Sequence, residues 1–92
     1  MIKSFRHKGL ETFFISGNKK GILAAHSNKI ARILDRLDAS LKPEDMNLPG
    51  YNLHKLIGQE KNTWSVWVNG NWRITFQFED ENVIIVDYRD YN

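Results

Sequence analysis

Apolar and polar residues alternate most regularly in the last third of the chain, where the pattern predicts three consecutive β-strands. Along residues 72–78 the aromatic and aliphatic side chains fall on one face, and Arg73, Thr75 and Gln77 fall on the other. An arginine on a strand is held rigidly, which a site that handles phosphate requires. Arg73 is therefore the first candidate for chemistry.

The hairpin between the first two of these strands has two possible registers. A two-residue Asn-Gly turn would place Val66 opposite Arg73, a core valine against a charge. A three-residue loop over 69–71 instead places Val66 opposite Ile74 and Trp67 beside Arg73, which keeps the apolar faces together. The pattern favours the second register. A further turn near 80–82 leads to a last strand over 83–88.

The first half of the chain shows helical periodicity after a short alternating segment, residues 1–5, that predicts a strand. Leu10, Phe13 and Phe14 recur at helical spacing, and Gly17 suits the end of that helix. A second helix begins between residues 24 and 28 and has ended by Ser40. Its core-facing stripe consists of Ile30, Ile33, Leu34 and Leu37. A single helical turn is expected over 42–46 and a short strand over 51–56.

These elements predict one α+β domain over residues 1–92, with an N-terminal strand and two helices packed on a mainly antiparallel sheet. The chain is 41% hydrophobic and 26% charged, which are ordinary values for a globular protein. No apolar run approaches the roughly 18–20 residues of a membrane span. The start lacks the apolar region of a signal peptide, and there are no cysteines. We therefore expect a cytoplasmic protein.

Charge is distributed unevenly, although the net charge is only +2. Residues 1–42 hold nine Lys or Arg against three Asp or Glu, and residues 43–92 hold four against eight. Within the second predicted helix, Lys29, Arg32 and Arg36 share one flank. This basic flank is compatible with an RNA-binding ridge and equally with an ordinary solvated helix face.

Several motifs give the chain a family resemblance. The strand Gly-x-Trp-Arg-Ile-x-Phe-x-Phe, the Val-Asp-Tyr ending, the terminal Asp-Tyr-x, the Met-Ile-Lys-Ser-Phe start and the segment Leu-Pro-Gly-Tyr-Asn-Leu-His-Lys-Leu over 48–56 resemble the HigB toxins. HigB is a branch of the RelE/ParE superfamily of bacterial toxin–antitoxin systems. The resemblance implies a microbial-ribonuclease-like fold and cleavage of messenger RNA in the A site of the 70S ribosome. It also implies a HigA-like helix-turn-helix antitoxin as partner.

Three central residues could act on RNA. The Arg73 guanidinium could stabilise the doubly charged phosphorus centre formed when a 2′-hydroxyl attacks. The structural alternative is an ion pair with Asp87 or Glu79. A neutral His54 could accept the 2′-hydroxyl proton, and Lys55 could hold the phosphate. Adjacent strand residues point to opposite faces, so His54 and Lys55 can serve one site only if the segment is irregular.

The end of the chain is rich in functional groups. HigB relatives carry a terminal Asp-Tyr-His in the active site, and the resemblance carries the first two positions over to Asp90 and Tyr91. Position 92 is asparagine, which forms hydrogen bonds but cannot exchange a proton near neutral pH. Asn92 is compatible with a natural enzyme that relies on His54 and Tyr91, with a weakened toxin that still binds its antitoxin, or with an engineered detoxifying substitution.

The remaining chemistry is sparse. His7 and His26 are expected to be solvated or structural. No histidine and carboxylate spacing predicts a metal site, and no glycine-rich loop predicts a nucleotide cofactor, so a metal-independent reaction is the consistent choice. Two other functions stay open: a non-enzymatic inhibitor like the gyrase poisons of the ParE branch, and a plain RNA-binding or antitoxin-binding domain.

Overall fold

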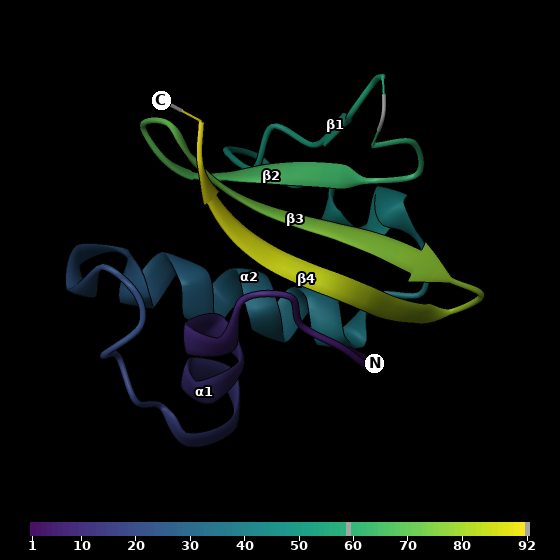
Figure 1. Cartoon of the computed structure of the whole chain (residues 1–92). Helices are drawn as coiled ribbons and strands as arrows, with labels where there is room; N and C mark the ends of the chain where they lie inside the picture. The colour runs from purple at the N-terminus through teal and green to yellow at the C-terminus, as the bar shows by residue number, and fades with distance from the viewer. Residues whose placement is uncertain (59, 92) are drawn as a thin grey trace.

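Two helices cover one face of a four-stranded antiparallel sheet (Figure 1). The computed structural model describes residues 1–58 and 60–91. The strands lie in the order β1-β2-β3-β4, so each strand after the first pairs with its predecessor. The elements are α1 (Lys8–Ser16), η1 (Ala24–His26), α2 (Ser27–Ala39), η2 (Pro43–Met46), β1 (His54–Lys55), β2 (Trp64–Asn69), β3 (Trp72–Glu79) and β4 (Asn82–Asp90).

Local signals fix both ends of α1. The Leu10 amide donates to His7 Nδ1 at 2.9 Å, so the histidine caps the first turn. Gly17 ends the helix in the left-handed region, with φ 79°, and its amide donates to the Phe13 carbonyl. The expected end of α1 and the expected bounds of α2 are confirmed, as is the short helical turn, which is η2.

The predicted register of the first hairpin is confirmed, because Val66 pairs with Ile74 and Trp67 with Arg73. The turn itself is tighter than expected. β2 extends to Asn69, which pairs with Trp72, and the register shifts by one residue between Trp67 and Asn69. A β-bulge therefore takes up the extra residue of the expected three-residue loop.

A second bulge lies in β4. Thr75 pairs with Asp87 and Gln77 pairs with Ile84, so the register shifts between them. Ile85 lies in this interval with φ 56°, a rare conformation for a β-branched residue. The extra residue re-aims the strand: Val86 points into the core and Asp87 to the opposite side.

The N-terminal segment follows β4 on its free side. Ile2 and Phe5 form isolated parallel bridges with Val83 and Val86, and the Ser4 hydroxyl accepts a hydrogen bond from the Ile85 amide. The expected strand over 1–5 is thus an extended segment held at two points. The bulge in β4 interrupts the ladder between those points.

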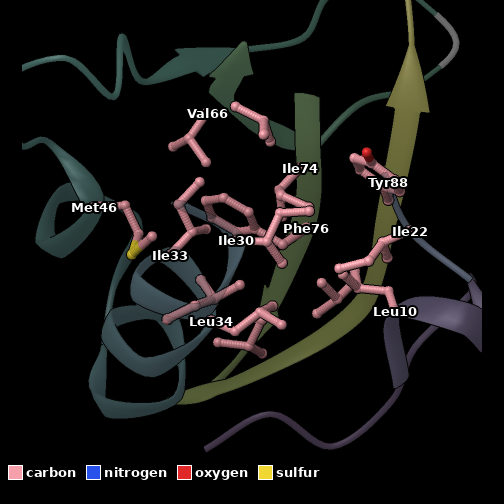
Figure 2. Close-up of a cluster of buried hydrophobic side chains, with 14 residues drawn as sticks. Leu10, Ile22, Ile30, Ile33, Leu34, Met46, Val66, Ile74, Phe76 and Tyr88 are labelled. Carbon is pink, nitrogen blue, oxygen red and sulfur yellow. The ribbon is translucent and has the colours of Figure 1, made fainter. Parts of the chain in front are cut away.

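The core lies between the helices and the sheet (Figure 2). Side chains of α1, α2 and η2 meet those of β2, β3 and β4, and Ile33, Ile74 and Phe76 are completely buried. Truncating one such side chain to alanine costs about 2–5 kcal/mol. We call the side of the sheet that the helices cover the helix face. In residues 1–58 and 60–91, no helix is long and apolar enough to cross a membrane.

Candidate active site

The other side of the sheet, which we call the open face, carries two rows of polar side chains. Directly paired residues of neighbouring strands project to the same side. One row runs across all four strands: His54, Ser65, Thr75 and Asp87. The neighbouring row consists of Trp67, Arg73 and Arg89.

An open cleft of about 600 Å³ lies over this face at the β1 and β2 side. His54 and Arg73 both line it, although 19 positions separate them in the sequence. The other lining residues are Asn52, Lys55, Leu56, Ile57, Ser65 and Trp67. The fold therefore brings His54 and Arg73 to one cavity.

Arg73 is held in a defined orientation on β3. Its Nη1 donates to the carbonyls of Gly70 at 2.6 Å and Trp72 at 3.0 Å. Its guanidinium carbon lies 4.9 Å from the centre of the Trp67 ring, within the range of a cation–π contact. Asp87, one of the carboxylates considered as an ion-pair partner, instead accepts a bond from Arg89.

His54 presents one ring nitrogen to solvent. Its Nδ1 lies 2.8 Å from the Asn52 carbonyl oxygen, which can only accept, so Nδ1 carries the proton of this bond. In a neutral imidazole the lone pair is then on Nε2. The side chain is exposed. Its geometry suits a general base that takes a proton from a substrate in the cleft.

Lys55 contributes to the same cleft from a different direction. It pairs with Trp64, and its Nζ lies 5.7 Å from the centre of that ring. Strand alternation directs the side chains of His54 and Lys55 to opposite sides of β1, although both residues line the cleft.

The C-terminal tail divides between the two faces. The Tyr91 hydroxyl lies 3.4 Å from Nη1 of Arg89, and the Tyr91 amide donates to the Asn71 carbonyl. Asp90 pairs with Trp72 and so belongs to the row of the helix face. Tyr91 thus lies beside Arg89, while strand alternation directs Asp90 away from Arg73. Asn92 lies outside the described residues.

Arg89 is a feature of the open face that was not expected from the sequence. Its Nε bonds Asp87 Oδ2 at 3.0 Å, and its Nη1 lies 2.7 Å from a carboxylate oxygen of Glu60. Burial lowers the pKa of Arg89, but the hydrogen bonds that it donates to Glu60 and Asp87 outweigh this effect and raise the pKa overall. The spacing Asp-x-Arg on a strand was the available signal, because it places both side chains on one face.

Two hydroxyl residues are buried beneath these charges. Ser65 is 5% exposed and Thr75 is fully buried. Within the part of the chain that the structure describes, Thr75 Oγ1 has no hydrogen-bond partner. A buried hydroxyl without a partner is unfavourable for folding.

The predicted basic flank lies on α2, which covers the helix face of the sheet (Figure 1). Lys29 Nζ lies 5.3 Å from the centre of the Tyr51 ring, and Arg36 Nε donates to the Asp45 carbonyl. Arg32 is exposed. These three cations come from α2, whereas Arg73 projects to the open face from β3.

The remaining histidines have structural contacts. His7 caps α1, as described above. His26 is 6% exposed and shares a 2.6 Å hydrogen bond with the Tyr88 hydroxyl. Burial raises the pKa of Tyr88 by more than its backbone hydrogen bond to Leu23 lowers it. Among residues 1–58 and 60–91, no cluster of three or more His, Asp or Glu could hold a metal ion.

Sequence comparison identifies the family. The model for HigB-like toxins, described as the RelE-like toxin of the type II toxin–antitoxin system HigB, matches residues 3–92. The chain belongs to this family. It is also 40% identical over 92 residues to the endoribonuclease HigB of Proteus vulgaris, and the match covers 100% of both chains. Membership in a type II family implies that a protein antitoxin is the partner of this HigB-like toxin.

Proposed function

We propose that this toxin is an endoribonuclease that cuts messenger RNA in the ribosomal A site, and that the open face of the sheet is its active site. The observation that carries the proposal is the meeting of His54 and Arg73 in one cleft. One supplies a free ring nitrogen and the other a fixed positive charge, which are the two functions that attack by a 2′-hydroxyl needs.

The reaction follows from these positions. His54 Nε2 removes the proton of a ribose 2′-hydroxyl, whose oxygen attacks the adjacent phosphorus. Arg73 stabilises the charge that develops on the non-bridging oxygens. The bond to the 5′-oxygen breaks, leaving a 2′,3′-cyclic phosphate and a 5′-hydroxyl. We assign protonation of the leaving oxygen to Tyr91, whose hydroxyl lies 3.4 Å from Nη1 of Arg89, the residue paired with Arg73.

Dependence on the ribosome is consistent with how little this site supplies. The cleft is open, His54 is exposed, and Asp90 belongs to the other face of the sheet. A site with few groups gains most from a substrate that is already bent and immobilised. The basic flank of α2, Lys29, Arg32 and Arg36, would then contact ribosomal RNA away from the scissile phosphate.

The antitoxin that we propose is a HigA-like helix-turn-helix protein that binds the helical half. The exposed loop over residues 18–21 carries Lys19 and Lys20, and the exposed Ile15 and Leu23 flank it. Apolar side chains beside positive charge suit an acidic amphipathic segment. Interface mapping by hydrogen exchange should protect residues 15–23. Protection confined to residues 64–91 would contradict this assignment.

In-vitro translation with sequencing of RNA ends tests the nuclease assignment. The wild-type chain should produce cuts in phase with codons on translated messages and none on the same messages without ribosomes. Intact message together with inhibited DNA supercoiling would instead identify a gyrase inhibitor of the ParE type. Cuts on free RNA would show a nuclease that does not need the ribosome.

A further inference from the structure

Arg73 and Arg89 form a directly opposed pair of cations on neighbouring strands. Like charges in this arrangement are destabilising, so the pair needs a compensating anion. The two arginines are compensated differently. Arg73 donates to neutral carbonyls and lies against Trp67, whereas Arg89 bonds the carboxylates of Glu60 and Asp87.

The two carboxylates on Arg89 are not equivalent. Asp87 lies two residues away on the same strand, and its side chain is 14% exposed. Glu60 comes from the loop between β1 and β2, and its side chain is 45% exposed. This loop reaches across the open face to make the contact, and beside it Gln77 Nε2 donates to Thr63 Oγ1 at 3.1 Å. Glu60 is therefore the carboxylate that can leave without moving a strand.

We propose that Arg89 is a second phosphate-binding residue and that Glu60 occupies its place until an RNA phosphate replaces it. A carboxylate and a phosphate bind the same donor fork of an arginine, so one can substitute for the other. When the Glu60 carboxylate leaves, Arg89 remains beside Arg73, and a phosphodiester between the two guanidinium groups relieves their repulsion. The inference rests on the proposed function, because it concerns the same substrate.

The proposal predicts that removing the charge of Glu60 strengthens RNA binding. Glu60→Gln keeps the shape of the side chain but competes poorly for a guanidinium. An exposed ion pair of this kind corresponds to a change of roughly two- to five-fold in affinity. The matched control is Glu81→Gln, which adds the same net charge at the exposed turn between β3 and β4.

The experiment is a titration of the full-length chain with a short single-stranded RNA whose riboses are 2′-O-methylated and so cannot be cleaved. NMR signals of the arginine Nε–H groups report Arg73 and Arg89 separately. Glu60→Gln should bind about two- to five-fold more tightly than Glu81→Gln, and both arginine signals should shift. In an Arg89→Gln background the gain from Glu60→Gln should vanish, as a double-mutant cycle requires.

Three results would overturn the proposal: equal affinities of Glu60→Gln and Glu81→Gln, an Arg89 signal that RNA leaves unmoved, or no binding at all. Weaker binding by Glu60→Gln would also overturn it and show that Glu60 positions the loop. If Arg89→Gln does not fold, the comparison of the two glutamate variants still decides. Codon-linked cleavage by the wild-type chain is measured separately, so the nuclease assignment can hold while this inference fails.

Discussion

The two faces of the sheet differ in how well their side chains are satisfied. The helix face buries Ile74 and Phe76 completely, and its buried His26 shares a hydrogen bond with the Tyr88 hydroxyl. The open face opposes two arginines and buries a threonine hydroxyl that has no described partner. Features that are unfavourable in the free protein concentrate where we place the substrate. The helix face supplies the core that folding requires, and we propose that the open face carries the chemistry.

A single strained residue assigns the side chains of β4 to these faces. With Ile85 in the left-handed region, Val86 and Tyr88 are buried while Asp87 and Arg89 project to the open face. If the strand alternated regularly from Val83 onward, each of these four side chains would point to the opposite face. The strain is stored at the junction of the two regions, as is common beside functional sites.

The largest effect is expected from His54→Ala. Loss of a general base lowers the rate about 10²- to 10⁴-fold. Because the side chain is exposed, the thermal unfolding midpoint should stay close to that of the wild type. Translation-coupled cleavage and calorimetry on the same preparation measure both. Normal cleavage by the variant would remove His54 from the mechanism.

The next effect concerns Asn92→His. If the histidine of the family pattern transfers a proton, its restoration should raise cleavage by about one to three orders of magnitude. The gain should titrate near the free imidazole value of ~6.5, shifted by neighbouring groups. Asn92→Ala is the control and should change cleavage little. Equal rates for all three chains would place the chemistry on His54 and Tyr91 alone.

A stability effect without a catalytic effect is expected from Gly9→Ala. A Cβ at Gly9 would lie 2.7 Å from the Gly21 Cα, a backbone atom that cannot move aside easily. Overpacking of this kind costs about 1–3 kcal/mol. Urea unfolding should show the loss, and cleavage per folded molecule should be unchanged. An unchanged free energy of unfolding would mean that α1 and the following loop can separate.

The smallest effect concerns Tyr88→Phe on the helix face. Because the pKa of Tyr88 is raised in the folded state, its contribution is fully present below about pH 10 and is lost as the pH rises through the folded-state value. At pH 7 the variant should lose about 0.5–1.5 kcal/mol of stability, because the hydrogen bond to His26 is gone. Above pH 10 its stability should fall less steeply than that of the wild type. Parallel alkaline unfolding curves would contradict this.

Hydrophobic periodicity predicted the helix face well, because its residues repeat at helical or strand spacing and the apolar pairing fixes the register of Val66 and Ile74. On the open face, the sequence predicted the side of Arg73 and Thr75 and the pairing of Trp67 with Arg73, but not the role of Arg89. The role of Arg89 depends on a contact with Glu60, which lies on a distant loop. The face of the sheet to which Asp87 points depends on Ile85, whose backbone is in the left-handed region. Neither leaves a periodic signal. The resemblance placed Asp90 in the active site, whereas its pairing with Trp72 directs it toward the helix face of the sheet.

The most direct test of the account compares two adjacent residues of β3 that face opposite ways. Arg73→Ala should lower translation-coupled cleavage about 10²- to 10³-fold and leave the free energy of unfolding nearly unchanged. Ile74→Ala should lose about 2–5 kcal/mol of stability and keep its cleavage rate per folded molecule. Arg6→Ala, which removes an exposed arginine before α1, controls for charge. Normal cleavage by Arg73→Ala, or its unfolding, would contradict the division between the two faces.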